Sequence, residues 1–273
     1  MLRDWVRDYA DSTDQVVGRV TRAISFMLVT LALERAQTDD GGPLFLVKGG
    51  VSMELRLNLR ARTTKDLDTV FRGQFGEWLD ALDDALAGDI DELSFSRSEP
   101  ADIPGAGAFR VDVAIDFKGR RWGQVQLEVA PAEAEAVLDV DEVEAFDIGQ
   151  FGLPSPGRIK VVSLPYLIAQ KLHACTEPPM DGRENQRVHD LIDLLLARDL
   201  LEQGDLERVR EACIAIFAGR ATHEWPPELV VFPRWRETFA KLATEENFPI
   251  ADVAQAAELV RGLIVEIEEA PPH

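Results

Sequence analysis

Cysteine is scarce in this chain, because only Cys175 and Cys213 occur among its 273 residues. Two thiols cannot build a disulfide framework or a cysteine-rich zinc site, and a reducing cytoplasm is the compartment that we expect. Long apolar runs are also missing. The most apolar early segment, ISFMLVTLAL at 24–33, follows a charged segment and is too short to span a bilayer. The sequence therefore predicts neither a membrane span nor a signal peptide.

Basic residues are in short supply as well. The chain has 29 Lys and Arg against 49 Asp and Glu, which gives a net charge of −20. A protein that coats nucleic acid usually has the opposite balance, so any nucleic-acid contact must be local. We find no internal repeat and no low-complexity tract, and the length fits one or two domains.

Hydrophobic periodicity predicts an α+β chain with its strands in the first half. Residues 1–37 and 75–87 are expected to be helical, LFLVK at 44–48 a buried strand, and Gly50 the start of a further helix. FRVDVAIDF at 109–117 and RWGQVQLEV at 121–129 are expected to form a hairpin with a three-residue loop, Lys118-Gly119-Arg120. That loop pairs Val113 with Val125 and Arg110 with Glu128, which places Glu128 on the polar face.

The segment PSPGR at 154–158 is the best boundary signal, and the sequence after it is mostly helical. We therefore expect two domains, a first at 1–153 that includes the N-terminal helices and a helical second at 154–273. Helices are predicted in the second domain at 164–176, 185–199, 205–218, 234–244 and 251–269.

Two carboxylates in TTKDLDTVF, Asp66 and Asp68, carry the first chemical signal. On a strand they project from one face at roughly 7 Å while Leu67 points inward. Such a pair can hold a hard cation, although it also occurs on solvated strand edges. Together with Glu128 it supplies the three acids that metal-dependent nucleotidyl transfer needs.

The glycines before this pair supply the second signal. A turn at Gly49 and Gly50 that opens a helix would present backbone N–H groups, up to Ser52, to nucleotide phosphates. The same Gly-Gly could be no more than a tight turn.

These residues resemble a known family. KGGVSMELRL followed by RTTKDLD is similar to the first signature of the AbiEii/AbiGii toxins, the nucleotidyltransferase toxins of type IV toxin–antitoxin systems that include the MenT group. AQKLHACTEPPMDGRENQRVHDLIDLLL is similar to the second signature. The match spans about residues 45 to 197. Two departures are Glu128, where the family usually has Asp, and His189, where it usually has Lys.

The resemblance implies a polymerase-β-like nucleotidyltransferase fold with a mixed sheet, followed by a mostly helical domain that contributes Lys171 and Asp190 to the active site. It also implies Mg²⁺, which Mn²⁺ could replace, an NTP substrate, and growth inhibition relieved by a separately encoded antitoxin. The residues expected to act are the metal ligands Asp66, Asp68 and Glu128, the catalytic Lys171 and Asp190, and the nucleotide-binding Lys48, Gly49, Gly50, Ser52, Arg62, Lys171 and Arg187.

Each residue of the second signature also has a simpler structural interpretation. Lys171 lies in the apolar stripe of its helix and could snorkel, and Arg187 and Asp190 could form a surface pair. We prefer a role in which Asp190 orients Lys171 or Arg187 and Asp193 supports the same polar face. The resemblance further makes Thr64 a candidate for regulatory phosphorylation, because a phosphate there brings negative charge to the acids.

The acceptor is the least determined part of the prediction. The family resemblance implies that the acceptor is the 3′ end of tRNA. The sequence permits this acceptor through local basic residues, namely Arg60, Arg62, Lys65, Arg72, Lys118, Arg120 and Arg121. The same residues could equally form a solvated face. Transfer to a small molecule such as an aminoglycoside would use the same acids. A nucleotide-binding protein without catalysis is the third alternative.

Overall fold

A computed structural model describes residues 2–58, 64–133, 139–179, 182–202 and 204–271. It divides the chain into two compact units. The first comprises Met1–Ala132 and Asp141–Val161, and the second comprises Glu133–Val140 and Val162–His273. The domain boundary expected after residue 153 stays a prediction. The two compact units divide the chain at other positions. Residues 154–161 belong with the first unit, and residues 133–140 belong with the second.

The first unit is built on a mixed sheet. Its eight described strands run in the order β3-β5-β6-β2-β1-β8-β7, and β4 pairs with β5. Their bounds are β1 Phe45–Val47, β2 Asp66–Phe71, β3 Leu93–Arg97, β4 Ala101–Ile103, β5 Ala108–Phe117, β6 Arg120–Pro131, β7 Val140–Glu144 and β8 Arg158–Val162. The central strands β2 and β6 are parallel, as are β1 and β8, whereas β1 and β2 are antiparallel.

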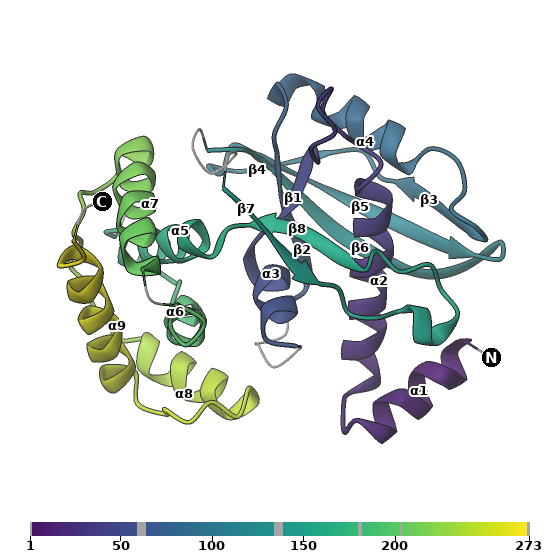
Figure 1. Cartoon of the computed structure of the whole chain (residues 1–273). Helices are drawn as coiled ribbons and strands as arrows, with labels where there is room; N and C mark the ends of the chain where they lie inside the picture. Colours follow the sequence, from purple (N-terminus) through teal and green to yellow (C-terminus); the bar gives the residue numbers. More distant parts are fainter. Residues whose placement is uncertain (1, 59–63, 134–138, 180–181, 203, 272–273) are drawn as a thin grey trace. The chain divides into compact units, whose positions relative to one another are not determined.

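The helices of the first unit are α1 (Leu2–Ser12), α2 (Val17–Leu33), α3 (Gly49–Arg56) and α4 (Trp78–Leu86), with short 3₁₀ turns at Phe75–Glu77 and Gly149–Phe151. Helix α2 lies across the sheet in Figure 1 and packs against β5 and β6. Its apolar face, including Ile24 and Met27, is buried in the core of this unit. The indole N–H of Trp122 on β6 donates to Ser25 Oγ on α2 at 3.2 Å.

The hairpin of β5 and β6 has the predicted pairs, Val113 with Val125 and Arg110 with Glu128. The predicted three-residue loop is wrong, because Phe117 pairs with Arg120 and the loop holds only Lys118 and Gly119. Both loop residues have positive φ, +53° and +69°, as a type I′ turn requires. A bulge between Ile115 and Asp116 restores the register, so the pairs farther from the turn agree with the prediction.

The second unit is helical. Its helices are α5 (Leu164–Thr176), α6 (His189–Arg198), α7 (Asp205–Arg220), α8 (Trp235–Glu245) and α9 (Val253–Glu268), all close to the predicted ranges. Helix α5 begins after Ser163 with Pro165 in its first turn, where a missing N–H costs nothing. It packs against α6 and α7, and α9 packs against α6, α7 and α8 (Figure 1).

The expected fold class, α+β with a mixed sheet and a mostly helical C-terminal part, is confirmed. The structure adds the strands β3, β4, β7 and β8, which the sequence did not indicate individually. Helix α6 begins four residues later than predicted, at His189 instead of residue 185. Among the described residues, none of the helices combines the length and apolarity needed to cross a membrane.

The turn between β5 and β6 provides a test of this fold. Gly119→Ala meets no steric obstacle, because no atom lies within 4 Å of the added Cβ, but it must adopt φ of +69°. The backbone strain should lower the free energy of unfolding by about 1 kcal/mol.

The measurement is urea-induced unfolding of the variant beside Gly18→Ala, a helical glycine whose added Cβ also meets nothing and whose φ is ordinary. Helix propensity makes the control neutral or stabilising. Equal stability of Gly119→Ala and the unmodified chain would contradict the assigned turn.

Candidate active site

The predicted acids lie on two adjacent strands of the first unit. Asp66 and Asp68 alternate with the buried Leu67 on β2, as expected for one strand face. On the parallel strand β6, Glu128 is the register partner of Asp68. Register partners on neighbouring strands share a face, so the sheet brings the three carboxylates to one side. We call these three residues the acidic cluster.

The turn before α3 lies directly against this cluster. A Cβ added to Gly49 would overlap Oδ2 of Asp68, and Gly49 has φ of +62°. The backbone N–H of Lys48 donates to the Asp68 carbonyl at 2.9 Å. Position 49 therefore accepts only glycine if Asp68 is to keep its place, which explains why the turn and the acids occur together.

Gly50 is in close contact with the residue predicted to be phosphorylated. An added Cβ at Gly50 would lie 2.7 Å from Cβ of Thr64. The Thr64 side chain is buried, and its hydroxyl donates to the Asp66 carbonyl at 3.3 Å. Phosphorylation of Thr64 stays a prediction, and a phosphate in this position would require the segment to move away from Gly50.

Two ion pairs hold the short helix α3 in place. Glu54 accepts from Arg19 Nη2 at 3.2 Å, and Arg56 Nη2 donates to Asp141 Oδ2 at 2.8 Å. Ser52 is fully buried, its hydroxyl accepts from Arg56 Nε at 3.4 Å, and its backbone N–H donates to the Lys48 carbonyl at 3.5 Å, so a phosphate contact of Ser52 stays a prediction. The N-cap residue Lys48 makes no side-chain capping bond. The first turn of α3 is thus a fixed set of amides beside the acidic cluster.

Glu128 has a cationic partner. Arg110, directly opposite on β5, donates from both Nε, at 3.0 Å, and Nη2 to Oε1 of Glu128. Both bonds use one oxygen, and no hydrogen bond or ion pair to Oε2 occurs within the described residues. The sequence predicted this pairing but not that Arg110 would hold a member of the acidic cluster.

The electrostatics of the cluster favour a cation. Burial and the charge of Glu128 raise the pKa of Asp66 above its usual value, while Arg110 and Lys65 oppose that rise. The described part of the chain contains no group of three Asp, Glu, His or Cys side chains already arranged around a metal position. Asp66, Asp68 and Glu128 as metal ligands therefore stay a prediction.

The second unit contains the other predicted residues. Lys171 on α5 is only 6% exposed, and its ammonium donates to Asp190 Oδ1 at 3.0 Å and to Asp193 Oδ2 at 2.6 Å, both on α6. The two aspartates are fully buried. A phosphate that contacted Lys171 would have to compete with these carboxylates.

Asp190 connects Lys171 to a more exposed cation. Its Oδ2 accepts from Arg187 Nε at 2.7 Å, and the Arg187 side chain is 49% exposed. Burial disfavours the ionised form of Asp190, but the charges of Lys171 and Arg187 outweigh it and hold the pKa of Asp190 below its usual value. Asp190 thus orients Arg187 while Lys171 keeps Asp190 ionised.

Two histidines of the second unit, His173 and His223, have structural surroundings. Burial lowers the pKa of His173 to about 4, so the ring is neutral, and it contacts Thr222 and Arg220. The ring of His223 bonds to Thr176 Oγ1 at 2.8 Å.

The expected basic groups are partly neutralised. At the hairpin tip, Arg121 pairs with Asp116 and Lys118 pairs with Glu92. Arg60 and Arg62 lie outside the described residues.

Replacing the buried cation tests the second unit. Lys171→Met should lower the free energy of unfolding by about 3–5 kcal/mol near neutral pH, because two buried carboxylates lose their counter-charge. In the unmodified chain the lowered pKa of Asp190 contributes stability that is present above its unfolded pKa and is lost as the pH falls. Without Lys171, burial should raise this pKa, so acid should stabilise the variant relative to the unmodified chain.

Chemical unfolding at about pH 8 and about pH 5 measures this effect. Lys241→Met, at an exposed pair on α8, is the control and should change little. A deficit of equal size at both pH values would contradict the assigned charge balance.

Comparison with known proteins gives two findings. The family model of the nucleotidyl transferase AbiEii toxin, type IV toxin–antitoxin system, matches residues 31–261. Among solved structures, MenT4, a nucleotidyltransferase toxin from Mycobacterium tuberculosis H37Rv, is similar with a TM-score of 0.57 and 14% identity over 97% of this chain and 98% of that chain. A search of curated proteins gives no match.

The two findings agree in scope. The structural similarity supports the expected nucleotidyltransferase fold over nearly the whole chain. The family match extends beyond the two sequence signatures on both sides and includes the acidic cluster, Lys171 and Asp190. The chain therefore belongs to the AbiEii family of nucleotidyltransferase toxins.

Proposed function

We propose that this chain transfers an NMP group from an NTP to an RNA acceptor with the help of Mg²⁺, and that the acceptor is the 3′ end of tRNA. The observation that carries this proposal is the close contact between Asp68 and Gly49, which places two acids beside a turn of backbone amides. Family membership implies a nucleotide substrate and an antitoxin partner. Modified tRNA ends would block translation and growth until the antitoxin acts.

The acidic cluster fits a magnesium ion by its chemistry. Its donors are carboxylate oxygens, which Mg²⁺ prefers, and a bound cation would oppose the burial and the Glu128 charge that raise the pKa of Asp66. Asp66 and Asp68 would hold the metal together with the nucleotide phosphates, and Glu128 would join them. When bound, the metal neutralises the charge that develops on the phosphates.

The reaction itself is a substitution at the α-phosphorus. The terminal ribose oxygen forms a new bond to the α-phosphorus, the bond to the bridging oxygen breaks, and pyrophosphate leaves with both electrons of that bond. The hydroxyl proton needs an acceptor. Glu128 suits this role, because Arg110 occupies only Oε1 and leaves Oε2 for a substrate proton.

Each unit has groups that suit an anion. In the first unit, the backbone amides of Gly49 and Gly50 at the start of α3 suit an anion, whereas the N–H groups of Lys48 and Ser52 already donate to backbone carbonyls. In the second unit, Arg187 is half-exposed and held in direction by Asp190. Lys171 was also expected to bind phosphate, and we propose that it acts chiefly by holding Asp190.

Asp68→Asn tests the reaction and the acceptor together. We expect transfer to fall about 10³-fold, because a charge that stabilises the transition state is lost while the fold is kept. The assay supplies Mg²⁺, each α-labelled NTP in turn, and either total tRNA or a panel of aminoglycosides. Asp102→Asn, an exposed acid on β4, is the control and should keep full activity.

Each alternative gives a different pattern in this assay. Label on the aminoglycosides alone would replace the toxin proposal with small-molecule transfer. Label on neither acceptor would favour a non-catalytic nucleotide-binding protein. Wild-type turnover by Asp68→Asn would refute the assignment of the acids.

Gly49→Ala tests the seating of Asp68. The added Cβ would displace the carboxylate, and displacement of a catalytic group by about 1 Å can cost about 100-fold in rate. The rate of tRNA labelling should therefore fall by about that factor. Gly18→Ala, whose added Cβ meets nothing, should keep the rate of the unmodified chain. A fully active Gly49→Ala would show that Asp68 does not need this position.

A further inference from the structure

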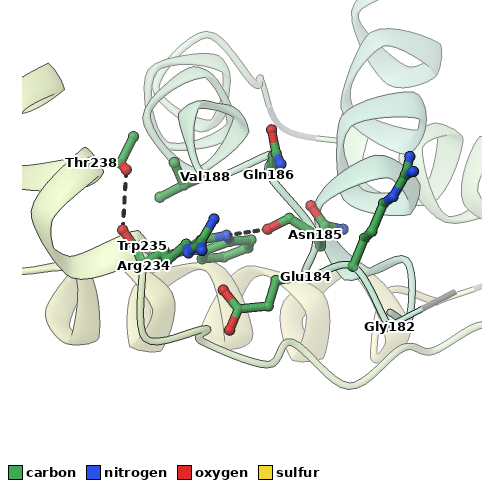
Figure 2. Close-up of a pocket in the computed structure, with 9 residues that line it drawn as sticks. Gly182, Glu184, Asn185, Gln186, Val188, Arg234, Trp235 and Thr238 are labelled. Atoms are coloured by element: carbon green, nitrogen blue, oxygen red, sulfur yellow. Dashed lines mark hydrogen bonds between the residues drawn. The ribbon is translucent and has the colours of Figure 1, made fainter. Parts of the chain in front are cut away.

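A pocket of about 560 Å³ lies in the second unit, outside the residues assigned so far. Its walls come from residues 182–186 and Val188, just before α6, and from the start of α8. Figure 2 shows Glu184, Asn185, Gln186, Arg234 and Trp235 around it. Arg183 also lines it. We call this cavity the arginine pocket, and its volume suits a ligand the size of a nucleotide.

Asn185 fixes the wall of the arginine pocket. Its Nδ2 donates to the carbonyls of Ala174 at 2.7 Å and Glu177 at 3.0 Å, at the end of α5. Its own carbonyl accepts from the indole N–H of the buried Trp235 at 2.6 Å, a bond drawn in Figure 2. Its Oδ1 accepts from the backbone N–H of Arg187 at 2.7 Å. The pocket is therefore preformed, and one residue joins it to the segment that carries Arg187.

The arginine pocket has cations without counter-charges. Arg183 and Arg234 are exposed, and neither forms an ion pair with any described residue. Other arginines of this unit do form such pairs, for example Arg208 with Asp139 and Arg220 with Glu133. In a chain with a net charge of −20, two unpaired guanidinium groups at one cavity indicate an anionic ligand, and guanidinium suits phosphate.

The arginine pocket also offers a hydrogen-bond acceptor. Oε2 of Glu184 is buried and has no hydrogen-bond partner among the described residues. A buried carboxylate oxygen without a donor is costly, and a hydroxyl or amino group of a ligand would satisfy it. A nucleotide carries both a phosphate and such donors, and the ribose 2′-hydroxyl of RNA is a donor that DNA lacks.

We propose that the arginine pocket binds one nucleotide of the single-stranded end of the RNA acceptor. Arg183 and Arg234 contact its phosphodiester, and Glu184 accepts from its ribose hydroxyl. This inference rests on the proposed function, because it names the place where that acceptor is held. It requires no change in the roles of the acidic cluster or of Arg187.

The test measures binding instead of catalysis. A short fluorescein-labelled single-stranded RNA is titrated with the full chain, and anisotropy gives the affinity at several salt concentrations. The double variant Arg183→Ala/Arg234→Ala should bind about tenfold more weakly. The slope of its affinity against salt concentration should also fall, by an amount equivalent to about one or two phosphate contacts. The control is Arg236→Ala, an exposed arginine on α8 that does not line the pocket, and it should bind normally.

Three further measurements complete the test. Glu184→Gln should reduce the preference for RNA over DNA of the same sequence, because the carboxylate acceptor is weakened. NTP affinity, measured by calorimetry, should be the same in the double variant and the unmodified chain. Since both arginines are exposed, the double variant should also keep the unfolding midpoint of the unmodified chain.

Several results would overturn the proposal. They are unchanged RNA affinity in the double variant, an equal loss in Arg236→Ala, a loss of NTP affinity, or no RNA binding by the unmodified chain. Failure here is distinct from failure of the proposed function. If the chain labels tRNA while the double variant binds RNA normally, only the pocket assignment fails. If pocket-dependent RNA binding occurs without any labelling, only the reaction fails.

Discussion

The first unit depends on the close approach of Asp68 to the backbone at Gly49, which only a residue without a Cβ allows. Antiparallel pairing of β1 with β2 sets this approach, since Val47 pairs with Thr69 and the Lys48 N–H donates to the Asp68 carbonyl. The parallel strand β6 then places Glu128 beside Asp68. One turn therefore fixes the amides that suit phosphate and the acids that suit a cation in a single arrangement.

The second unit applies the same physical rule inside a helical fold. Lys171 is buried between Asp190 and Asp193, and a buried charge persists only when it is paired. The pair keeps Asp190 ionised, and Asp190 directs the half-exposed Arg187. In both units, most of the charged side chains named here are therefore paired or partly buried. A chain with a net charge of −20 can in this way expose a positive group, such as Arg187, at a defined position.

The sequence predicted what depends on local pattern. Alternation gave the face shared by Asp66 and Asp68 and the pairing of Arg110 with Glu128, and apolar spacing gave the five helices of the second unit. It could not predict short strands such as β4 and β7, which have only a few residues and little apolar alternation. The hairpin loop was predicted one residue too long, because the bulge beside it leaves no clear signal. The arginine pocket joins segments about 50 residues apart, which no local pattern reports.

The central claim is that Asp66 and Asp68 hold a divalent cation together with the nucleotide. Mn²⁺ is paramagnetic and binds the same oxygen ligands, so electron paramagnetic resonance can measure its binding directly in the presence of a non-hydrolysable NTP analogue. We predict that the unmodified chain binds Mn²⁺ with the analogue, that Mg²⁺ displaces it, and that Asp68→Asn weakens binding by at least about tenfold. Equal Mn²⁺ affinity in the two proteins would contradict the account.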